Sequence, residues 1–135
     1  MKRVLFVCTW NAIRSPMAAA LLMAHRPGWH VESAGVHMQP VNPFAVTVLD
    51  EIGLNLRNHI SRCLQDVTFS PAFDCTISLS ESACKALSDC EQSGAGPHAH
   101  WPVKVPSYME GNRDQQLERF RAIRDELATL ISKAF

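Results

Sequence analysis

Apolar residues along the chain gather in four short runs, and each run is followed at some distance by a segment of helical character. The first run, RVLFV at residues 3–7, is almost wholly apolar, as expected of a strand buried on both faces of a parallel sheet. A proline in the last run, Pro102, favours an edge position for that strand. The predicted strands are residues 3–7, 29–32, 73–79 and 100–103.

Four segments between and after these runs predict helices. Ser15 and Pro16 read as a helix start, with a capping hydroxyl followed by proline at the first helical position. The last segment is the clearest, because its apolar residues recur at steps of three and four and form one face. That face comprises Leu117, Phe120, Ile123, Leu127, Leu130 and Ile131. The predicted helices are residues 17–25, 43–52, 81–90 and 113–135.

The alternation of strands with helices predicts an α/β fold with a doubly wound parallel sheet and helices on both faces. A length of 135 residues suits one domain, residues 1–135, with one core. Ligands of such sheets bind beyond the carboxyl ends of the strands. Cys8 lies at the carboxyl end of the first predicted strand, and this position makes it the first candidate for a functional residue.

Composition and charge narrow the classes of partner. The 13 Lys and Arg residues balance the 13 Asp and Glu residues, so bulk charge gives no support for binding nucleic acid or an anionic membrane. The first residues are too short and too polar for an export signal, which leads us to expect a cytoplasmic protein. Five cysteines argue against a disulfide framework, and no metal site is expected. His98 and His100 have no ligand partners at a recognisable spacing and are interpreted as exposed or strand-end side chains.

The stretch CTWNAIRSP, which begins at Cys8, combines features that suit an anion. Backbone amides of a tight loop, the start of a helix and the planar fork of Arg14 all favour a phosphate-like group. The same positive field favours the thiolate of Cys8 and makes it a nucleophile, and Ser15 is placed to donate a hydrogen bond to that thiolate. Asn11 tolerates the left-handed backbone that such a loop needs. The residues expected to hold the oxyanion are Thr9, Trp10, Asn11, Ala12, Ile13 and Arg14.

This stretch resembles the C-x-x-N-x-x-R-S loop of the low-molecular-weight protein tyrosine phosphatases and the related thiol-dependent arsenate reductases. Further resemblances are VESAG, NPFAVTVLDEIGLNLRNHISRCL, FDCTISLS and HWPV, which together span most of the chain. The resemblance implies a four-stranded parallel sheet with flanking helices. It also implies Cys8, Arg14 and Ser15 as catalytic residues, a phosphocysteine intermediate, and neither metal nor cofactor.

The sequence departs from the family where the general acid is expected. The family places an Asp-Pro pair after the fourth strand, and that Asp protonates the leaving oxygen. Here Pro106 is kept, but Val105 precedes it. Glu110 and Asp114 are the nearest carboxylates. The resemblance therefore implies a phosphatase whose rate is impaired unless another group supplies the proton.

Two further departures concern substrate and redox chemistry. Trp10 and Tyr108 are the aromatic residues available to line the mouth of the site, where family members that act on phosphotyrosine carry aromatics. Thioredoxin-coupled arsenate reductases have a resolving cysteine at the place of Ser80. Cys84 and Cys90 lie nearby and are the only candidates for a redox relay with Cys8, and ordinary packing thiols are the alternative interpretation.

Three hypotheses stay open on the sequence. The first is a cysteine-dependent phosphatase acting on phosphate monoesters, with a phosphoprotein among the possible substrates. The second is an arsenate reductase that uses Cys8 with external thiols, supplied by thioredoxin or glutaredoxin, or with Cys84 and Cys90. The third is a binding module that keeps the oxyanion site without catalysis. A phosphate- or arsenate-like oxyanion is the partner common to all three.

Overall fold

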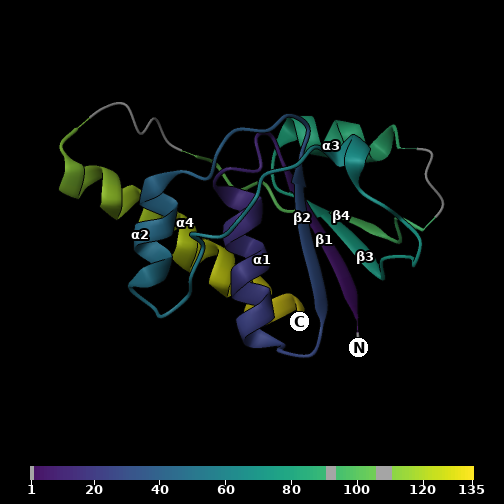
Figure 1. The fold of residues 1–135 in the computed structure, drawn as a ribbon, viewed down its shortest axis with the longest axis horizontal. Coiled ribbons are helices and arrows are strands. Elements are labelled where there is room, and N and C mark those ends of the chain that lie inside the picture. Colours follow the sequence, from purple (N-terminus) through teal and green to yellow (C-terminus); the bar gives the residue numbers. More distant parts are fainter. Residues whose placement is uncertain (1, 91–93, 106–110) are drawn as a thin grey trace.

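The computed structural model describes residues 2–90, 94–105 and 111–135 (Figure 1). Its centre is a four-stranded parallel sheet in the order β2-β1-β3-β4, which confirms the predicted fold class. The order places β1 inside the sheet and β4 at one edge, as the proline in that region predicts. The strands are β1 (Arg3–Cys8), β2 (His30–Gly35), β3 (Cys75–Ser78) and β4 (His98–His100).

Strand β1 is apolar from Val4 to Cys8 because both faces of the sheet are covered by helices. Val4 and Phe6 face a core that contains residues of α1 (Arg14–His25), α2 (Pro43–Asp50) and α4 (Arg113–Ala134). Leu5 and Val7 face a second, smaller core with α3 (Glu81–Ser88). All four of these strand residues are fully buried. Figure 1 shows α1, α2 and α4 on one side of the sheet and α3 on the other.

Helix α4 buries the predicted apolar face. Leu117, Phe120, Ile123, Leu127 and Ile131 are buried, and Leu130 is half-buried beside them. The helix begins with a capping box in which the Asn112 side chain accepts from the Gln115 amide and the Gln115 side chain accepts from the Asn112 amide. Both otherwise unpaired amides at the helix start are thereby satisfied.

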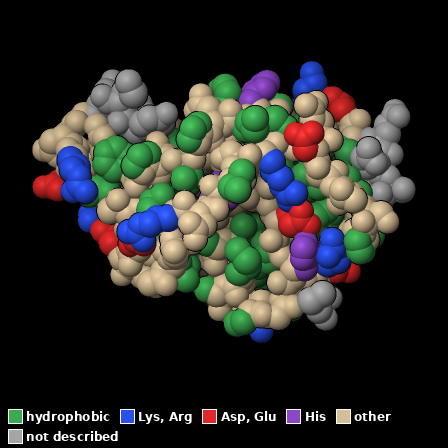
Figure 2. Space-filling view, viewed as in Figure 1, with side chains coloured by type: hydrophobic (Ala, Val, Ile, Leu, Met, Phe, Trp, Pro, Cys, Tyr) green, Lys and Arg blue, Asp and Glu red, His purple; other side chains and the backbone are tan. Residues whose placement is uncertain are grey.

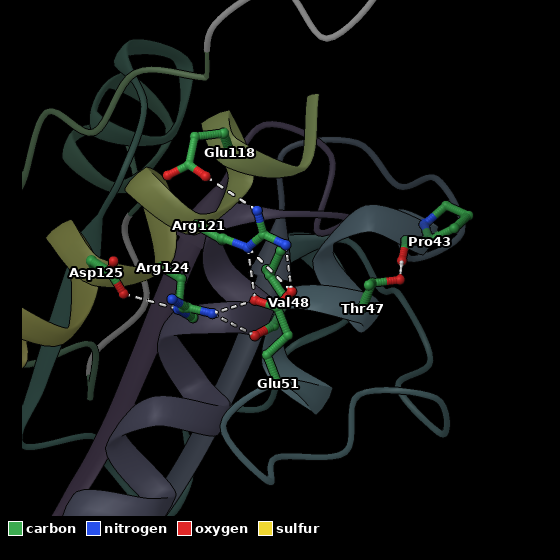
Figure 3. Close-up of polar contacts among 8 residues, drawn as sticks. All are labelled: Pro43, Thr47, Val48, Glu51, Glu118, Arg121, Arg124 and Asp125. Carbon is green, nitrogen blue, oxygen red and sulfur yellow. Dashed lines mark hydrogen bonds and ion pairs between the residues drawn. The ribbon is translucent and has the colours of Figure 1, made fainter. Parts of the chain in front are cut away.

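A cluster of charged side chains fastens α2 to α4 (Figure 3). Arg121 donates to Glu51 from Nε to Oε1 at 2.9 Å and from Nη2 to Oε2 at 2.7 Å. Arg124 donates from Nη1 to Glu51 Oε1 and to the carbonyl of Val48, both at 2.9 Å. Hydrogen bonds from Arg121 hold the pKa of Glu51 at about 2. This cluster fixes the C-terminal end of α2, and the other end of α2 borders the site described below.

Several observed elements begin or end away from the predicted positions, as β2 does by running on to Gly35, and three of these differences have a clear physical cause. Helix α1 begins at Arg14, and the Ser15 hydroxyl does not cap it, because that hydroxyl is buried and bonded to other groups. Strand β4 is His98–His100 instead of residues 100–103, because Pro102 has no amide to extend the ladder. Helix α3 ends at Ser88, so Cys90 lies beyond it.

Positive and negative side chains are interspersed on the face shown in Figure 2, in keeping with the balanced charge of the sequence. Within the described residues, no helix is long and apolar enough to cross a membrane.

Candidate active site

The loop of residues 8–14, here called the cysteine loop, leaves the carboxyl end of β1 and enters α1. Four of its carbonyl groups accept hydrogen bonds on the outer side of the loop, from backbone amides of residues 36–42. The pairs are Cys8 with Val36, Thr9 with His37, Trp10 with Gln39, and Ala12 with Asn42. No hydrogen bond among the described residues uses a backbone amide of residues 9–13 as a donor. The loop therefore presents amides on its inner side, as an anion-binding nest does.

Asn11 holds the loop in shape from within. Its φ angle is 54°, the left-handed conformation that the sequence predicts at this position. Its fully buried side chain donates to Ser15 Oγ at 2.8 Å and to Ser33 Oγ at 3.0 Å. The same amide group accepts from the Arg62 backbone at 3.0 Å. Three of the bonds that a side-chain amide can form are thus used to fix the loop against β2 and the segment that follows α2.

Two residues that the sequence argument assigned no role, His59 and Ser61, support the same loop. Both donate to the Asn11 carbonyl, from His59 Nε2 at 3.1 Å and from Ser61 Oγ at 2.9 Å. Burial lowers the pKa of His59, partly offset by the bond to Asn11. The sequence signal for them is the H-x-S pattern of residues 59–61, which lies within the NPFAVTVLDEIGLNLRNHISRCL segment that resembles the family.

Gly35, at the end of β2, lets the cysteine loop approach the strand. A Cβ at this position would lie 2.7 Å from the Asn11 amide nitrogen and 2.9 Å from the Trp10 carbonyl carbon. Because both neighbours are backbone atoms, the loop itself would have to shift to accept any side chain there.

Cys8 and Ser15 form a buried pair at the floor of the loop. Cys8 Sγ lies 3.0 Å from Ser15 Oγ, and the Ser15 hydroxyl lies 3.2 Å from the carbonyl of Ala34. A hydroxyl has one proton, so it cannot donate to both at once. With a Cys8 thiol, the thiol donates to Ser15 and the hydroxyl donates to Ala34. With a thiolate, the hydroxyl turns to the sulfur and stabilises its charge.

Arg14 is held from behind by the chain segments that follow β3 and β4. Its Nη1 donates to the carbonyls of Leu79 at 3.1 Å and Val103 at 2.9 Å, and its Nη2 contacts Thr9 Oγ1 at 3.4 Å. These bonds leave the Nε–H and one Nη2–H without a partner among the described residues, and together they can bind two oxygens of one anion. Burial lowers the pKa of Arg14, while the charge of Cys8 opposes that change.

A cavity of about 190 Å³ opens above Cys8 and Arg14. Val105, half-buried, forms part of its wall, so the residue at the family's general-acid position faces the site. Trp10 is 44% exposed at the rim and packs on His37 with ring centroids 5.2 Å apart. The described lining contains no carboxylate and no histidine: it comprises Cys8, Trp10, Ala12, Ile13, Arg14, Gln39, Pro40, Asn42 and Val105.

Other candidates from the sequence are not among the described residues that line this cavity. Asp114 is exposed in the first turn of α4 and is absent from the described lining. Pro106, Tyr108 and Glu110 fall outside the described residues, so the roles suggested for Tyr108 and Glu110 stay predictions.

The thiols of the suggested redox relay lie on and after α3. Cys84 and Cys90 are both half-buried and free, and neither lines the cavity. Helix α3 nevertheless contacts the cysteine loop, because Ser82 Oγ lies 2.9 Å from Thr9 Oγ1. The relay from Cys8 through Cys84 or Cys90 stays a prediction.

The two histidines of β4 are a strand-end pair, as the sequence indicates. His98 Nε2 and His100 Nδ1 lie 2.9 Å and 2.7 Å from the Ser78 hydroxyl. Among the described residues, no group of three or more His, Cys, Asp and Glu side chains is arranged to hold a metal.

Comparison with known proteins gives consistent matches along the chain. The model of a family described as low molecular weight phosphotyrosine protein phosphatase matches residues 3–135. An arsenate reductase from Halalkalibacterium halodurans is 30% identical, over 96% of this chain and 92% of its own length.

Solved structures give the same picture. An arginine phosphatase from Geobacillus stearothermophilus is 29% identical with a TM-score of 0.78, over 98% of this chain and 90% of its own. A low molecular weight protein tyrosine phosphatase from T. tengcongensis is 27% identical with a TM-score of 0.75, over 98% of this chain and 97% of its own.

Proposed function

Because the chain belongs to the low molecular weight phosphotyrosine protein phosphatase family, we propose that it is a cysteine-dependent phosphatase that cleaves phosphate monoesters through a phosphocysteine. The observation that carries this proposal is the cavity itself. It unites the Cys8 thiol, the Arg14 guanidinium and a loop whose inner amides are unpaired among the described residues.

Binding of the phosphate follows from charge and geometry. The amides of residues 9–13 and the positive end of α1 attract the equatorial oxygens. Arg14 donates from its free Nε–H and Nη2–H, and its bonds to Leu79 and Val103 keep the guanidinium plane in place. Asn11 keeps the loop open through its contacts to Ser15 and Ser33.

The chemical step begins at the floor of the cavity. The Cys8 thiolate attacks phosphorus, an S–P bond forms, and the ester oxygen leaves on the opposite side with the electron pair of the P–O bond. Ser15 stabilises the thiolate before attack and again when water cleaves the S–P bond, because its hydroxyl lies 3.0 Å from the sulfur.

Arsenate reduction is the second candidate, favoured by the 30% identical arsenate reductase. In that reaction Cys8 would attack arsenic, and a second thiol would release arsenite, the two sulfurs supplying two electrons and ending as a disulfide. The second thiol would come from Cys84 or Cys90, or from thioredoxin or glutaredoxin.

A paired assay separates the candidates. We expect the wild-type protein to hydrolyse p-nitrophenyl phosphate and Cys8→Ser to have no activity. Cys84→Ser and Cys90→Ser should keep that hydrolysis. They should lose arsenate reduction if these cysteines supply the second thiol, and keep it if thioredoxin or glutaredoxin supplies it. If phosphate binds but no Cys8-dependent turnover of either substrate is measured, the protein is an oxyanion-binding module and the phosphatase proposal is wrong.

A further inference from the structure

We propose that this site is built for acyl phosphates, the mixed anhydrides of a carboxylic acid with phosphoric acid, and that it accumulates the phosphocysteine they form. The proposal rests on the phosphatase function above and specifies its substrate class. Its basis is the combination of a nucleophile and an anion site with a cavity wall whose described residues include no carboxylate and no histidine to protonate the leaving group.

The position of Val105 is fixed by the same contacts that fix Arg14. The Val103 carbonyl accepts from Arg14 at 2.9 Å, and the Val103 amide donates to the Trp101 carbonyl at 2.8 Å. The backbone is therefore anchored two residues before Val105, whose side chain borders the cavity. An apolar side chain consequently occupies the wall from which the family's carboxylic acid would act.

The other described residues around the cavity are poor proton donors. An in-line attack from Cys8 expels the leaving group away from the floor, towards the walls and mouth. Ser15 is fully buried next to the Cys8 sulfur. It therefore lies on the side of the phosphate opposite to the leaving oxygen and cannot protonate that oxygen. Gln39 and Asn42 carry amides, which donate hydrogen bonds without titrating, and Arg14 stays protonated.

A leaving group that departs without a proton must be a stable anion. A carboxylic acid has a pKa of about 4, whereas a phenol such as tyrosine has a pKa of about 10. Attack of Cys8 on an acyl phosphate forms the S–P bond and breaks the P–O bond, and the electron pair leaves with the carboxylate. No proton is consumed, so the absence of an acid costs this reaction little. The same absence costs a phenyl ester about 10²- to 10⁴-fold in rate.

The second step is slowed for a related reason. Water must attack phosphorus, break the S–P bond, return the electron pair to Cys8 as thiolate, and lose a proton. No carboxylate or histidine in the described lining is placed to take that proton, so we expect hydroxide or a base from bulk solvent to take it. Phosphocysteine formed quickly from an acyl phosphate should then persist.

The test is a leaving-group series measured by rapid quench with acetyl phosphate, p-nitrophenyl phosphate and phenyl phosphate. The Cys8→Ser variant serves to subtract spontaneous hydrolysis. We expect one rapid turnover of acetyl phosphate per enzyme, then a slow steady state, with one added phosphoryl group on the intact protein by mass spectrometry. Phenyl phosphate should react at least about 100-fold more slowly in the first turnover.

A matched pair of variants tests the role of the wall. Val105→Asp should raise the rate with phenyl phosphate far more than that with acetyl phosphate, whereas Val105→Asn, of similar size but without a titrating group, should not. Thermal melts check that both variants fold. If they do not fold, the leaving-group series measured with the wild-type protein decides the proposal.

Two results have separate meanings. Equal first-turnover rates for phenyl and acetyl phosphate overturn the proposed substrate class and leave the phosphatase function standing. Glu110→Gln and Asp114→Asn would then identify the acid. Failure of all three donors to phosphorylate Cys8 overturns the phosphatase function, and the substrate class with it.

Discussion

At the scale of single residues, the sequence predicts the residues of the candidate site but not the partners that hold them. Cys8, Asn11, Arg14 and Ser15 lie within eight positions of one another, so the loop chemistry can be recognised from a local pattern. The partners that hold them are remote: Arg14 is bonded to carbonyls 65 and 89 residues away. Backbone carbonyls carry no residue-specific signal, and for this reason the anchoring of Arg14 could not be predicted.

Arg14 gives the sharpest test at this scale. We expect Arg14→Ala to abolish phosphate binding measured by calorimetry, because the cavity loses its only described guanidinium. Arg14→Lys should restore binding only in part, since an ammonium lacks the planar fork that binds two oxygens. Its three N–H donors are also too few for the two bonds to Leu79 and Val103 together with a bidentate anion contact. Unchanged affinity in Arg14→Ala would show that the anion binds elsewhere.

At the scale of elements, β1 and α4 were the most predictable because their patterns have a single physical cause. A strand covered on both faces must be apolar throughout, and a helix covered on one face must repeat its apolar residues every three or four positions. Strand β4 was placed two residues late because a short edge strand has few buried residues: His98 and Ala99 are exposed. The start of α1 was misplaced because the Ser15 hydroxyl contacts Cys8 and Asn11 and does not cap the helix.

The contact between α2 and α4 predicts an acid-dependent loss of stability. The pKa of Glu51 is held at about 2, against about 4.5 for the unperturbed group, chiefly by hydrogen bonds from Arg121. A lowered carboxyl pKa contributes stability that is present above pH 4.5 and is lost as the pH falls towards 2. The side chains of Glu51 and Arg121 are each about one third exposed, so salt should weaken the effect.

Glu51→Gln is the matched variant, because it keeps the shape and removes the titration. Its melting temperature should lie below that of the wild type near neutral pH, and the gap should narrow between pH 4.5 and 2. A gap that stays constant over this range would mean that Glu51 acts by packing alone.

At the scale of the whole molecule, the five cysteines allow exposure and chemical activation to be compared in one experiment. Cys8 is 2% exposed, whereas Cys63, Cys75, Cys84 and Cys90 are all half-buried. If solvent exposure alone decided how fast each thiol is alkylated, Cys8 would be modified last. If the guanidinium of Arg14 and the positive end of α1 favour its thiolate, it should be modified first. Burial raises the pKa of Cys75, which should make that thiol slow to react.

The measurement is mass mapping after brief treatment with iodoacetate at a pH well below the ordinary thiol pKa of about 8.5. We expect carboxymethylation of Cys8 before any other thiol, because the reagent is an anion and the proposed anion site lies above that sulfur. Phosphate should protect Cys8 and leave the labelling of the other four unchanged, which separates occupation of the site from a general change in the fold. Labelling of Cys84 or Cys90 first, with Cys8 inert, would contradict an activated nucleophile. In that case the thiol chemistry of this protein would have to be sought on α3 and the residues that follow it.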